Sequence, residues 1–254
     1  MKIIALDSSG LVASVALLED TGLVGEYNIQ YKKTHSQTLL PMLEELKDQV
    51  ELELSTVDAI AIASGPGSFT GLRIGSATAK GLAYALQIPI IEIPTLQGLA
   101  CNLYGTDKLV CPIMDARREQ VYTGIYAFEK KENSGSTEGL HEPDSYIMKE
   151  TLSDRPVSVA EIAQHCNELD REVIFLGDGV PVYGEKLKEL MKVPYQLAPA
   201  HMNRQRAAAF GVLAFDWYAE GRYVSAMEHA PEYLRLSQAE RERLERMKQA
   251  DGQG

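Results

Sequence analysis

The sequence has no long apolar run. Nowhere in its 254 residues do roughly 18 apolar residues follow one another, so it contains no candidate transmembrane helix. The opening residues, MKIIALD, reach an acidic side chain too early for a signal peptide. Cysteine is also scarce: Cys101, Cys111 and Cys166 are odd in number and widely spaced, which favours buried free thiols over disulfides or a CxxC metal site. We therefore expect a cytoplasmic protein that is not associated with a membrane.

Positive charge is in short supply. The chain has 25 Lys and Arg residues against 36 Asp and Glu residues, which gives a formal net charge of −11. Tight binding of nucleic acid usually requires a basic patch, because the phosphate backbone repels an acidic surface. We expect any role with nucleic acid to run through a partner protein.

Recognisable catalytic motifs are missing as well. No HxxxH or HExxH pair, which a helical zinc site would require, occurs among the five histidines His35, His141, His165, His201 and His229. No GxSxG turn marks a serine nucleophile, and the sequence makes no histidine partner of a serine or cysteine evident. We predict no metal site and no catalytic residue, although triads assemble in space and not along the chain.

Predicted elements occur twice in the same order, strand-strand-strand-helix-strand-helix-strand-helix. In the first half, strands are predicted at 2–7, 12–18, 23–31, 59–63 and 88–93, and helices at 36–50, 72–86 and 95–103. In the second half, strands are predicted at 109–114, 120–128, 145–149, 172–176 and 195–197, and helices at 158–169, 182–191 and 204–220. Thr95 and Ser158 are predicted N-caps, Ser158 with Glu161 in the capping-box position. The charged stretch 130–144 is predicted to be a mobile surface loop.

A repeated order of elements indicates two duplicated lobes. Two mixed five-stranded sheets with helices match the α/β actin-like (ribonuclease H-like) fold, and two unrelated α/β domains are the alternative. We expect a first lobe at 1–105, completed by the helix at 204–220, a second lobe at 106–235, and a charged tail at 236–254.

Three turns could bring backbone N–H groups close to a phosphate as a weak nucleotide or anion site. They contribute the candidate residues Asp7, Ser8, Ser9, Gly65, Gly67, Ser68, Thr70, Gly177, Asp178 and Gly179. The Gly-rich turn at 65–71 leads into a helix, which is a common anion site. It is not a Walker A loop, because no lysine follows the second glycine at the required place, and Thr70 replaces the third glycine of a dinucleotide fingerprint. A structural tight turn is the favoured alternative there, and a plain strand-to-helix turn is an equal alternative for 177–179.

The turn that follows the strand at 109–114 reads Asp115-Ala116-Arg117-Arg118-Glu119 and contains no glycine. In a duplicated fold it is the counterpart of the turn at Asp7. Without glycine, a close approach of phosphate is not expected at this turn. Asp115 is interpreted as a structural acid that accepts hydrogen bonds from backbone donors.

Two helices of the first half have little polar surface. The helix at 36–50 has an apolar face about 160° wide, against about 100° for an ordinary surface helix. That face consists of Leu39, Leu40, Met42, Leu43 and Leu46. From residue 74 on, the helix at 72–86 carries one charge and many Gly and Ala residues, which allow another helix to approach closely. We predict that both helices bind a second chain, the second helix through Leu72, Ala77, Lys80, Gly81 and Tyr84. A central position of the second helix within its own lobe is the alternative.

Six stretches, in order over almost the whole chain, resemble one family. They are IALDSS at 4–9, HSQTLLP at 35–41, GPGSFTGLRIG at 65–75, DARREQVY at 115–122, GDG at 177–179 and PEYLR at 231–235. The chain resembles the TsaB family, bacterial subunits needed to make threonylcarbamoyladenosine in tRNA. Among the motif positions we single out Arg73, Arg117, Glu119 and Tyr122.

The resemblance implies an actin-like fold and a complex with the catalytic paralogue TsaD and the ATPase TsaE. It implies that the two N-terminal helices pack against their counterparts in TsaD, that the chain forms a homodimer when alone, and that tRNA is contacted only indirectly. TsaD-like chains carry a metal-binding HxxxH, whereas the corresponding helix here, LACNLY at 99–104, has no histidine. The transferase chemistry is therefore not carried over, and we expect no cofactor apart from weak ATP or ADP binding within the complex.

The predicted function is a non-catalytic subunit that supports TsaD, with TsaE, in transferring the threonylcarbamoyl group from threonylcarbamoyl-AMP to the N6 of the tRNA adenosine beside the anticodon. Two alternatives remain open. The first is a stand-alone actin-like ATPase or small-molecule kinase, which Asp7 and the turn at 177–179 would serve. The second is a metalloprotease.

Overall fold

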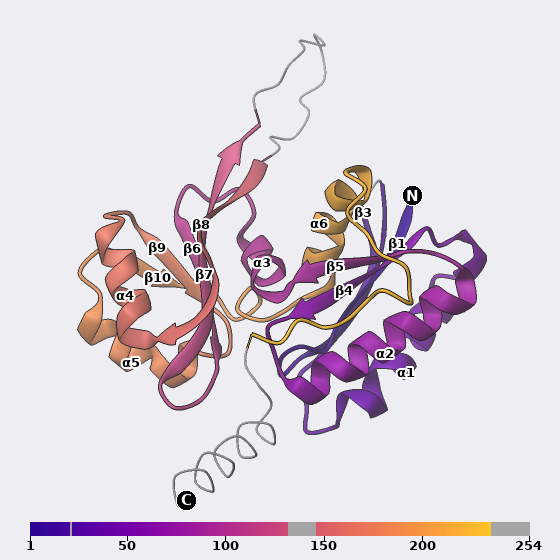
Figure 1. Ribbon diagram of the computed structural model, residues 1–254, viewed down its shortest axis with the longest axis horizontal. Coiled ribbons are helices and arrows are strands. Elements are labelled where there is room, and N and C mark those ends of the chain that lie inside the picture. The colour runs from indigo at the N-terminus through magenta and orange to yellow at the C-terminus, as the bar shows by residue number, and fades with distance from the viewer. Residues whose placement is uncertain (21, 132–145, 235–254) are drawn as a thin grey trace, which may run out of the picture.

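The computed structural model describes residues 1–20, 22–131 and 146–234, which form two α/β lobes (Figure 1). Each lobe is built on one five-stranded mixed sheet. The predicted loop at 130–144, except for its first two residues, and the predicted tail at 236–254 lie outside the described residues. The duplicated, actin-like two-lobe architecture predicted from the sequence is confirmed.

The two sheets repeat one topology. The first has the order β3-β2-β1-β4-β5, formed by β1 (Lys2–Asp7), β2 (Ala13–Glu19), β3 (Gly22–Ile29), β4 (Ala59–Gly65) and β5 (Ile90–Pro94). The second has the order β10-β9-β6-β7-β8, formed by β6 (Leu109–Asp115), β7 (Gln120–Lys130), β8 (Tyr146–Ser158), β9 (Val173–Leu176) and β10 (Tyr195–Leu197). In each sheet the first three strands pair antiparallel and the other two add in parallel. The two sheets therefore share both the order in which their strands are connected and the relative directions of those strands.

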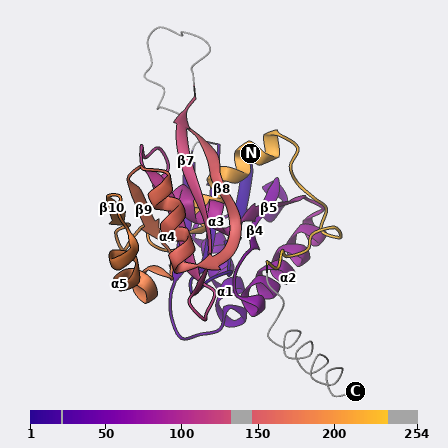
Figure 2. The same ribbon diagram turned by 60° about the vertical axis from the view of Figure 1, so that its left-hand side comes forward.

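β8 is much longer than the sequence predicts. The weak strand signal at 145–149 becomes a strand of 13 residues, paired with β7 from Tyr146 opposite Lys130 to Ser158 opposite Gln120. Most of its side chains are exposed or half-buried, so it lacks the apolar alternation that marks a strand in a sequence. Backbone pairing at the sheet edge determines its length, and Figure 2 shows the two strands running together.

The helices of the first lobe are α1 (His35–Gln49), α2 (Phe69–Leu86), α3 (Thr95–Ala100) and α6 (Ala207–Ala219), with short 3₁₀ turns at Leu54–Thr56 and Cys101–Leu103. α1 and α2 cover one face of the sheet and α6 covers the other. Alternate side chains of β1 serve the two faces: Ile4 and Leu6 pack with α1 and α2, and Ile3 and Ala5 pack with α6. Because both faces are covered, β1 is a continuous apolar run in the sequence.

The second lobe has α4 (Val159–Glu168) and α5 (Val180–Leu190) on one face of its sheet. The N–H of Glu161 donates to Oγ of Ser158 at 3.1 Å, so the predicted cap of α4 is confirmed. The cap predicted at Thr95 is wrong, because α3 begins at that residue and its buried hydroxyl makes no cap hydrogen bond. The other face of the second sheet packs against α3 of the first lobe.

After α6 the chain continues along the first lobe as a C-terminal strap, residues 223–234, drawn in yellow in Figure 1. Ile90 of β5 and Val224 exchange both backbone hydrogen bonds, at 2.8 and 2.9 Å. The N–H of Glu232 donates to the carbonyl oxygen of Ser64 in β4 at 2.7 Å. The strap therefore lies on the first sheet, although the sequence-based boundary assigned it to the second lobe.

No helix in the described ranges combines the length and the apolar character that crossing a bilayer requires.

Candidate functional site

Asp7 is the last residue of β1 and is completely buried. Its Oδ1 accepts a hydrogen bond from the N–H of Ser9 at 2.7 Å, whereas its Oδ2 has no partner among the described residues. Burial raises the pKa of this carboxyl from 3.8 to about 6. Ser8 and Ser9 are buried as well, so this turn is closed to solvent.

The Gly-rich turn packs directly on the turn at Asp7. A Cβ on Gly71 would lie 2.0 Å from the carbonyl oxygen of Ser8, and a Cβ on Gly67 would lie 2.4 Å from that of Ser9. The N–H of Ser68 donates to the carbonyl oxygen of Ser9 at 2.7 Å. The glycines thus permit a close contact between two segments, and the chain itself fills the space beside the first turn. These contacts favour the structural alternative for this turn.

The N-terminus of α2 is satisfied by its own chain. Oγ of Ser68 accepts the N–H of Gly71 at 3.3 Å, and the carbonyl oxygen of Ser68 accepts the N–H of Leu72 at 2.8 Å. Thr70 is exposed on the first turn of the helix, and Gly65 is buried beneath the strap. The helix end therefore offers fewer free donors to an anion than the sequence pattern suggests.

Asp115, Asp178 and Tyr183 form a hydrogen-bonded group at the end of β6. Oδ1 of Asp178 accepts the N–H of Asp115 at 2.9 Å, and the hydroxyl of Tyr183 donates to Oδ1 of Asp115 at 2.8 Å. Burial raises the pKa of Asp178, and burial followed by the bond to Asp115 raises the pKa of Tyr183 to about 12. Asp115 accepts structural hydrogen bonds here, as interpreted from the sequence.

The turn at 177–179 is fixed against β6. A Cβ on Gly177 would lie 2.2 Å from the carbonyl oxygen of Ile113, and a Cβ on Gly179 would lie 2.9 Å from the same atom. Gly177 has a φ of +110°, which also favours glycine. Among the described residues, no hydrogen bond joins this turn directly to the group around Asp7.

The glycine-free turn between β6 and β7 adopts a backbone that glycine usually provides. Arg117, Arg118 and Glu119 have positive φ values of 66°, 55° and 59°. Oδ1 of Asp115 accepts the N–H of Arg117 at 2.8 Å, and Nζ of Lys186 lies 2.9 Å from Oε2 of Glu119. A left-handed turn therefore forms at this position without glycine.

The apolar face of α1 is covered by its own lobe. Leu39, Met42, Leu43 and Leu46 are all at most 6% exposed and pack in the core between α1 and the sheet. The prediction that these side chains bind a second chain is wrong for the folded monomer, because a helix that covers a sheet turns its apolar face inward. Leu40 is the exception at 53% exposure.

α2 has one buried and one exposed face. Leu72 is buried beneath the helix, so its predicted place in an interface is corrected in the same way. Ala77, Gly81 and Tyr84 are exposed, Tyr84 to 64%, and an added Cβ on Gly81 would meet nothing within 4 Å. Lys80 is half-buried, and its Nζ donates to the carbonyl oxygen of His229 at 2.9 Å. The exposed face thus combines the small residues Ala77 and Gly81 with the large ring of Tyr84.

Arg73 lies where the strap meets the start of α2. Its guanidinium carbon is 4.0 Å from the centroid of the Phe69 ring, and its Nε donates to the hydroxyl of Tyr233 at 3.4 Å. The rings of Phe69 and Tyr233 are 4.7 Å apart. Tyr122 of β7 lines a small pocket beside Tyr233, so this motif residue lies close to the strap.

No sequence pattern marks His229 as an anchor of the strap. The imidazole is buried, and its Nδ1 lies 2.6 Å from Oε1 of Glu92 in β5. Its partner is 137 positions away along the chain, so no local pattern reveals the pair. The PEYLR motif at 231–235 was the one sequence feature that pointed to this region.

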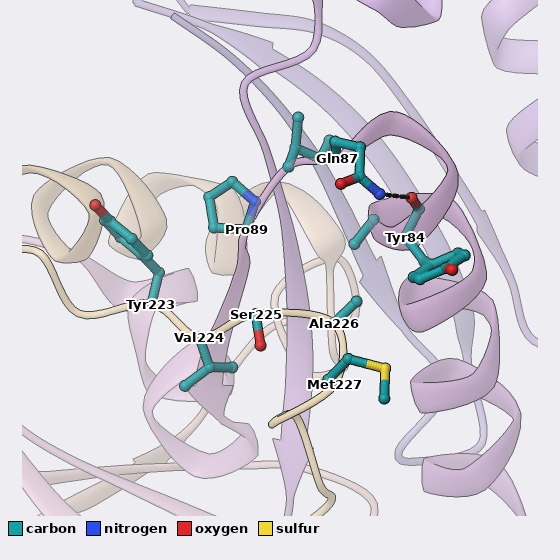
Figure 3. Close-up of a pocket in the computed structure, with 10 residues that line it drawn as sticks. Tyr84, Gln87, Pro89, Tyr223, Val224, Ser225, Ala226 and Met227 are labelled. Atoms are coloured by element: carbon teal, nitrogen blue, oxygen red, sulfur yellow. Dashed lines mark hydrogen bonds between the residues drawn. The ribbon is translucent and has the colours of Figure 1, made fainter.

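A groove of about 350 Å³ lies between the C-terminal end of α2 and the start of the strap (Figure 3). Its walls include Tyr84 and Gln87 on one side and Tyr223 and Met227 on the other. Nε2 of Gln87 donates to the carbonyl oxygen of Tyr84 at 2.6 Å. Because Tyr84 belongs to both, the groove continues the exposed face of α2.

The three cysteines lie in the interior of the protein. All three thiols are free and buried, and burial raises the pKa of Cys101 to about 12. No group of three His, Cys, Asp or Glu side chains within the described ranges has the geometry to hold a metal ion.

Known proteins resemble this chain in both sequence and fold. The model of the TsaD family, tRNA N6-adenosine threonylcarbamoyltransferase, matches residues 23–243. The Bacillus subtilis protein named tRNA threonylcarbamoyladenosine biosynthesis protein TsaB is 31% identical over 248 residues, 98% of this chain and 100% of that protein. The Escherichia coli protein of the same name is 31% identical over 92% of this chain and 95% of its own length. The solved structure of YeaZ from Pseudomonas aeruginosa is 31% identical, with a TM-score of 0.72 over 92% of this chain and 100% of that chain.

The relatives match over nearly their full length, and the two duplicated lobes superpose on a solved relative. The chain therefore belongs to the TsaB family of tRNA threonylcarbamoyladenosine biosynthesis proteins.

Proposed function

We propose that this chain is a non-catalytic subunit of the complex that makes threonylcarbamoyladenosine in tRNA. It binds the catalytic paralogue TsaD and, together with the ATPase TsaE, supports transfer of the threonylcarbamoyl group from threonylcarbamoyl-AMP to N6 of the adenosine beside the anticodon. The observation that carries the proposal is the exposed face of α2, where Ala77 and Gly81 leave the helix backbone uncovered beside Tyr84.

Small residues on an exposed helix face suit a second helix, because they allow the two backbones to approach closely. Exposed residues recur along α2 at positions 70, 73, 77, 81 and 84, which places them on one side of the helix. Leu40 of the neighbouring α1 adds apolar surface. A partner with the same fold can present the corresponding helix across a pseudo-twofold axis, and the match to the TsaD family model supports such a partner.

Contacts in the interior of the first lobe favour a non-catalytic role for this chain. The close contacts of Gly67 and Gly71 with the turn at Ser8 and Ser9 occupy the space that a phosphate would need there. We therefore expect ATP or ADP to bind this chain weakly and only within the complex. Because the net charge of this chain is −11, we expect the partner to supply most of the surface that binds tRNA.

The same face of α2 can also bind a second copy of this chain. We expect the isolated chain to form a homodimer through α2 and the assembled chain to exchange that contact for TsaD. We also expect the complex to lie in the cytoplasm, where tRNA is modified.

Reconstitution tests the proposed function. Purified chain, TsaD and TsaE are mixed with tRNA and threonylcarbamoyl-AMP, and formation of the modified nucleoside is measured. We expect the product to require this chain, and the chain alone to form none. Equal activity without the chain would contradict the proposal. Micromolar binding of Mg-ATP to the isolated chain in calorimetry would favour a stand-alone ATPase instead.

A further inference from the structure

The turn between β6 and β7 carries three successive non-glycine residues in the left-handed region: Arg117, Arg118 and Glu119. Left-handed φ values are unfavourable for residues with a Cβ, and a run of three is rare. Such backbone persists only where surrounding contacts fix it, and it is concentrated at ligand-binding sites. The proposed function has so far left this motif without a role.

Contacts on every side fix the turn. Oδ1 of Asp115 accepts the N–H of Arg117 at 2.8 Å and the hydroxyl of Tyr183 at 2.8 Å. The N–H of Gln120 donates to the carbonyl oxygen of Arg117 at 3.1 Å, and the carbonyl oxygen of Glu119 accepts from Val159 at 3.3 Å. The turn is thus held by β6, by α5 and by the start of α4.

The carboxylate of Glu119 does not neutralise the neighbouring arginines. Its Oε2 lies 2.9 Å from Nζ of Lys186 on α5, so this acid already has a cationic partner. Both arginine side chains are exposed, and neither forms an ion pair with a residue in the described ranges. The backbone N–H groups of Arg118 and Glu119 also have no acceptor within those ranges.

Two guanidinium groups next to two free backbone N–H groups match the chemistry of a phosphate group. A guanidinium donates two parallel hydrogen bonds to phosphate oxygens, and successive free N–H groups add short, directional donors. The arrangement therefore fits a phosphate group.

The first lobe limits which phosphate can bind. In a nucleotide that spans both lobes, the turn at Ser8 and Ser9 would have to hold a phosphate, and Gly67 and Gly71 pack against that turn instead. An isolated contact at the second turn suits a phosphodiester of an extended nucleic acid. We propose that Arg117 and Arg118 bind the tRNA backbone directly in the assembled complex, an inference that rests on the proposed function.

The test measures tRNA binding by the complex reconstituted with the double variant Arg117→Gln/Arg118→Gln. We expect its affinity to fall roughly tenfold at physiological ionic strength, and the slope of log affinity against log salt to fall by about 1 to 2 in magnitude. The variant Arg117→Lys/Arg118→Lys keeps the charge and should retain most of the slope. The control Lys188→Gln/Lys192→Gln removes two exposed charges from the same lobe and should change neither quantity.

Assembly with TsaD is measured separately for every variant, so failure of the proposed function is distinguishable. If the wild-type chain does not join TsaD, the proposed function fails. If it joins and the arginine variant binds tRNA with wild-type affinity and slope, only the present inference is overturned. Lost assembly with unchanged tRNA binding would mean that the turn binds protein. An arginine-dependent affinity of the isolated chain for Mg-ATP, without an effect on tRNA, would assign the site to a nucleotide. Either result overturns the inference.

Discussion

Nδ1 of His229 lies 2.6 Å from Oε1 of Glu92, although the two residues are 137 positions apart in the sequence. The same carboxylate oxygen also accepts the N–H of Ala230 at 3.4 Å. The carbonyl oxygen of His229 accepts from Lys80 of α2 at 2.9 Å. One buried histidine thus joins the C-terminal strap to β5 through its side chain and to α2 through its backbone.

Removal of the His229 side chain should loosen the strap around residue 229, while the backbone pairing of Ile90 with Val224 remains. We expect His229→Ala to lower the free energy of unfolding by about 2 kcal/mol, because a buried hydrogen bond to a charged group is lost. Urea unfolding measures this change, and limited proteolysis should show earlier cleavage within 223–234. His201→Ala is the matched control, since His201 is exposed. Equal unfolding midpoints for the two variants would contradict the anchoring role.

Asp7 should make the stability of the protein depend on pH. Its pKa is about 6 in the folded state against 3.8 in water, because burial disfavours the charged carboxylate. The folded state therefore binds the proton more tightly than the unfolded state, and stability is lost as pH rises from about 4 to about 6. The loss amounts to about 3 kcal/mol for a shift of this size.

Asp7→Asn removes this titration. The difference in free energy of unfolding between variant and wild type should shift in favour of the variant as pH rises from 4 to 6, and should then stay level. Urea unfolding at a series of pH values measures it. A flat difference would show that the carboxyl of Asp7 is not perturbed.

Gly71 should tolerate no side chain. Its Cβ would lie 2.0 Å from the carbonyl oxygen of Ser8, so Gly71→Ala must push the two turns apart. We expect a loss of about 3 kcal/mol in unfolding free energy, the upper part of the usual range for overpacking. Thermal unfolding by circular dichroism checks the value. Stability equal to that of the wild type would mean that the turns are not in contact.

A substitution at Gly81 should affect the stability of the isolated chain and its binding to the partner in opposite directions. An added Cβ there would meet nothing within 4 Å, and leucine is a better helix former than glycine by about 0.5–1 kcal/mol. Gly81→Leu should therefore stabilise the isolated chain slightly while raising the Kd for TsaD at least about tenfold, because the bulk blocks close helix contact.

Gly184 of α5 provides the control for this variant, since an added Cβ there is equally unhindered. Gly184→Leu should stabilise the chain to a similar extent and leave the Kd for TsaD unchanged. Calorimetric titration with TsaD measures both variants. Wild-type affinity of Gly81→Leu would remove α2 from the interface.

Local sequence patterns predicted most of the helices and strands, but they did not predict what each helix or strand packs against. The apolar run of β1 and the spacing of Ser158 and Glu161 are set by neighbours in the chain, so the sequence reveals them. The period of Leu39, Leu43 and Leu46 shows that α1 has an apolar face, yet it cannot show whether a sheet or another protein covers that face. The sequence therefore placed in an interface side chains that belong to the core.

The candidate site was less predictable for the same reason. The close contact of Gly71 with Ser8 and the bond between His229 and Glu92 join segments that are 63 and 137 residues apart, and no local pattern encodes such pairs. The turn at Arg117 illustrates a second limit. Its left-handed backbone is imposed by Asp115, Gln120 and Val159, whereas its own residues favour other conformations.

The packing of α3 against the second sheet has a mechanical consequence. Leu96 and Leu99 share one apolar cluster with Met114, Tyr126 and other buried residues of the second lobe. A hinge motion that swung the lobes apart would expose this cluster to water, at a cost of roughly 1.5–3 kcal/mol for each large side chain. Opening of the two lobes is therefore costly, and we expect the two sheets to keep one relative arrangement.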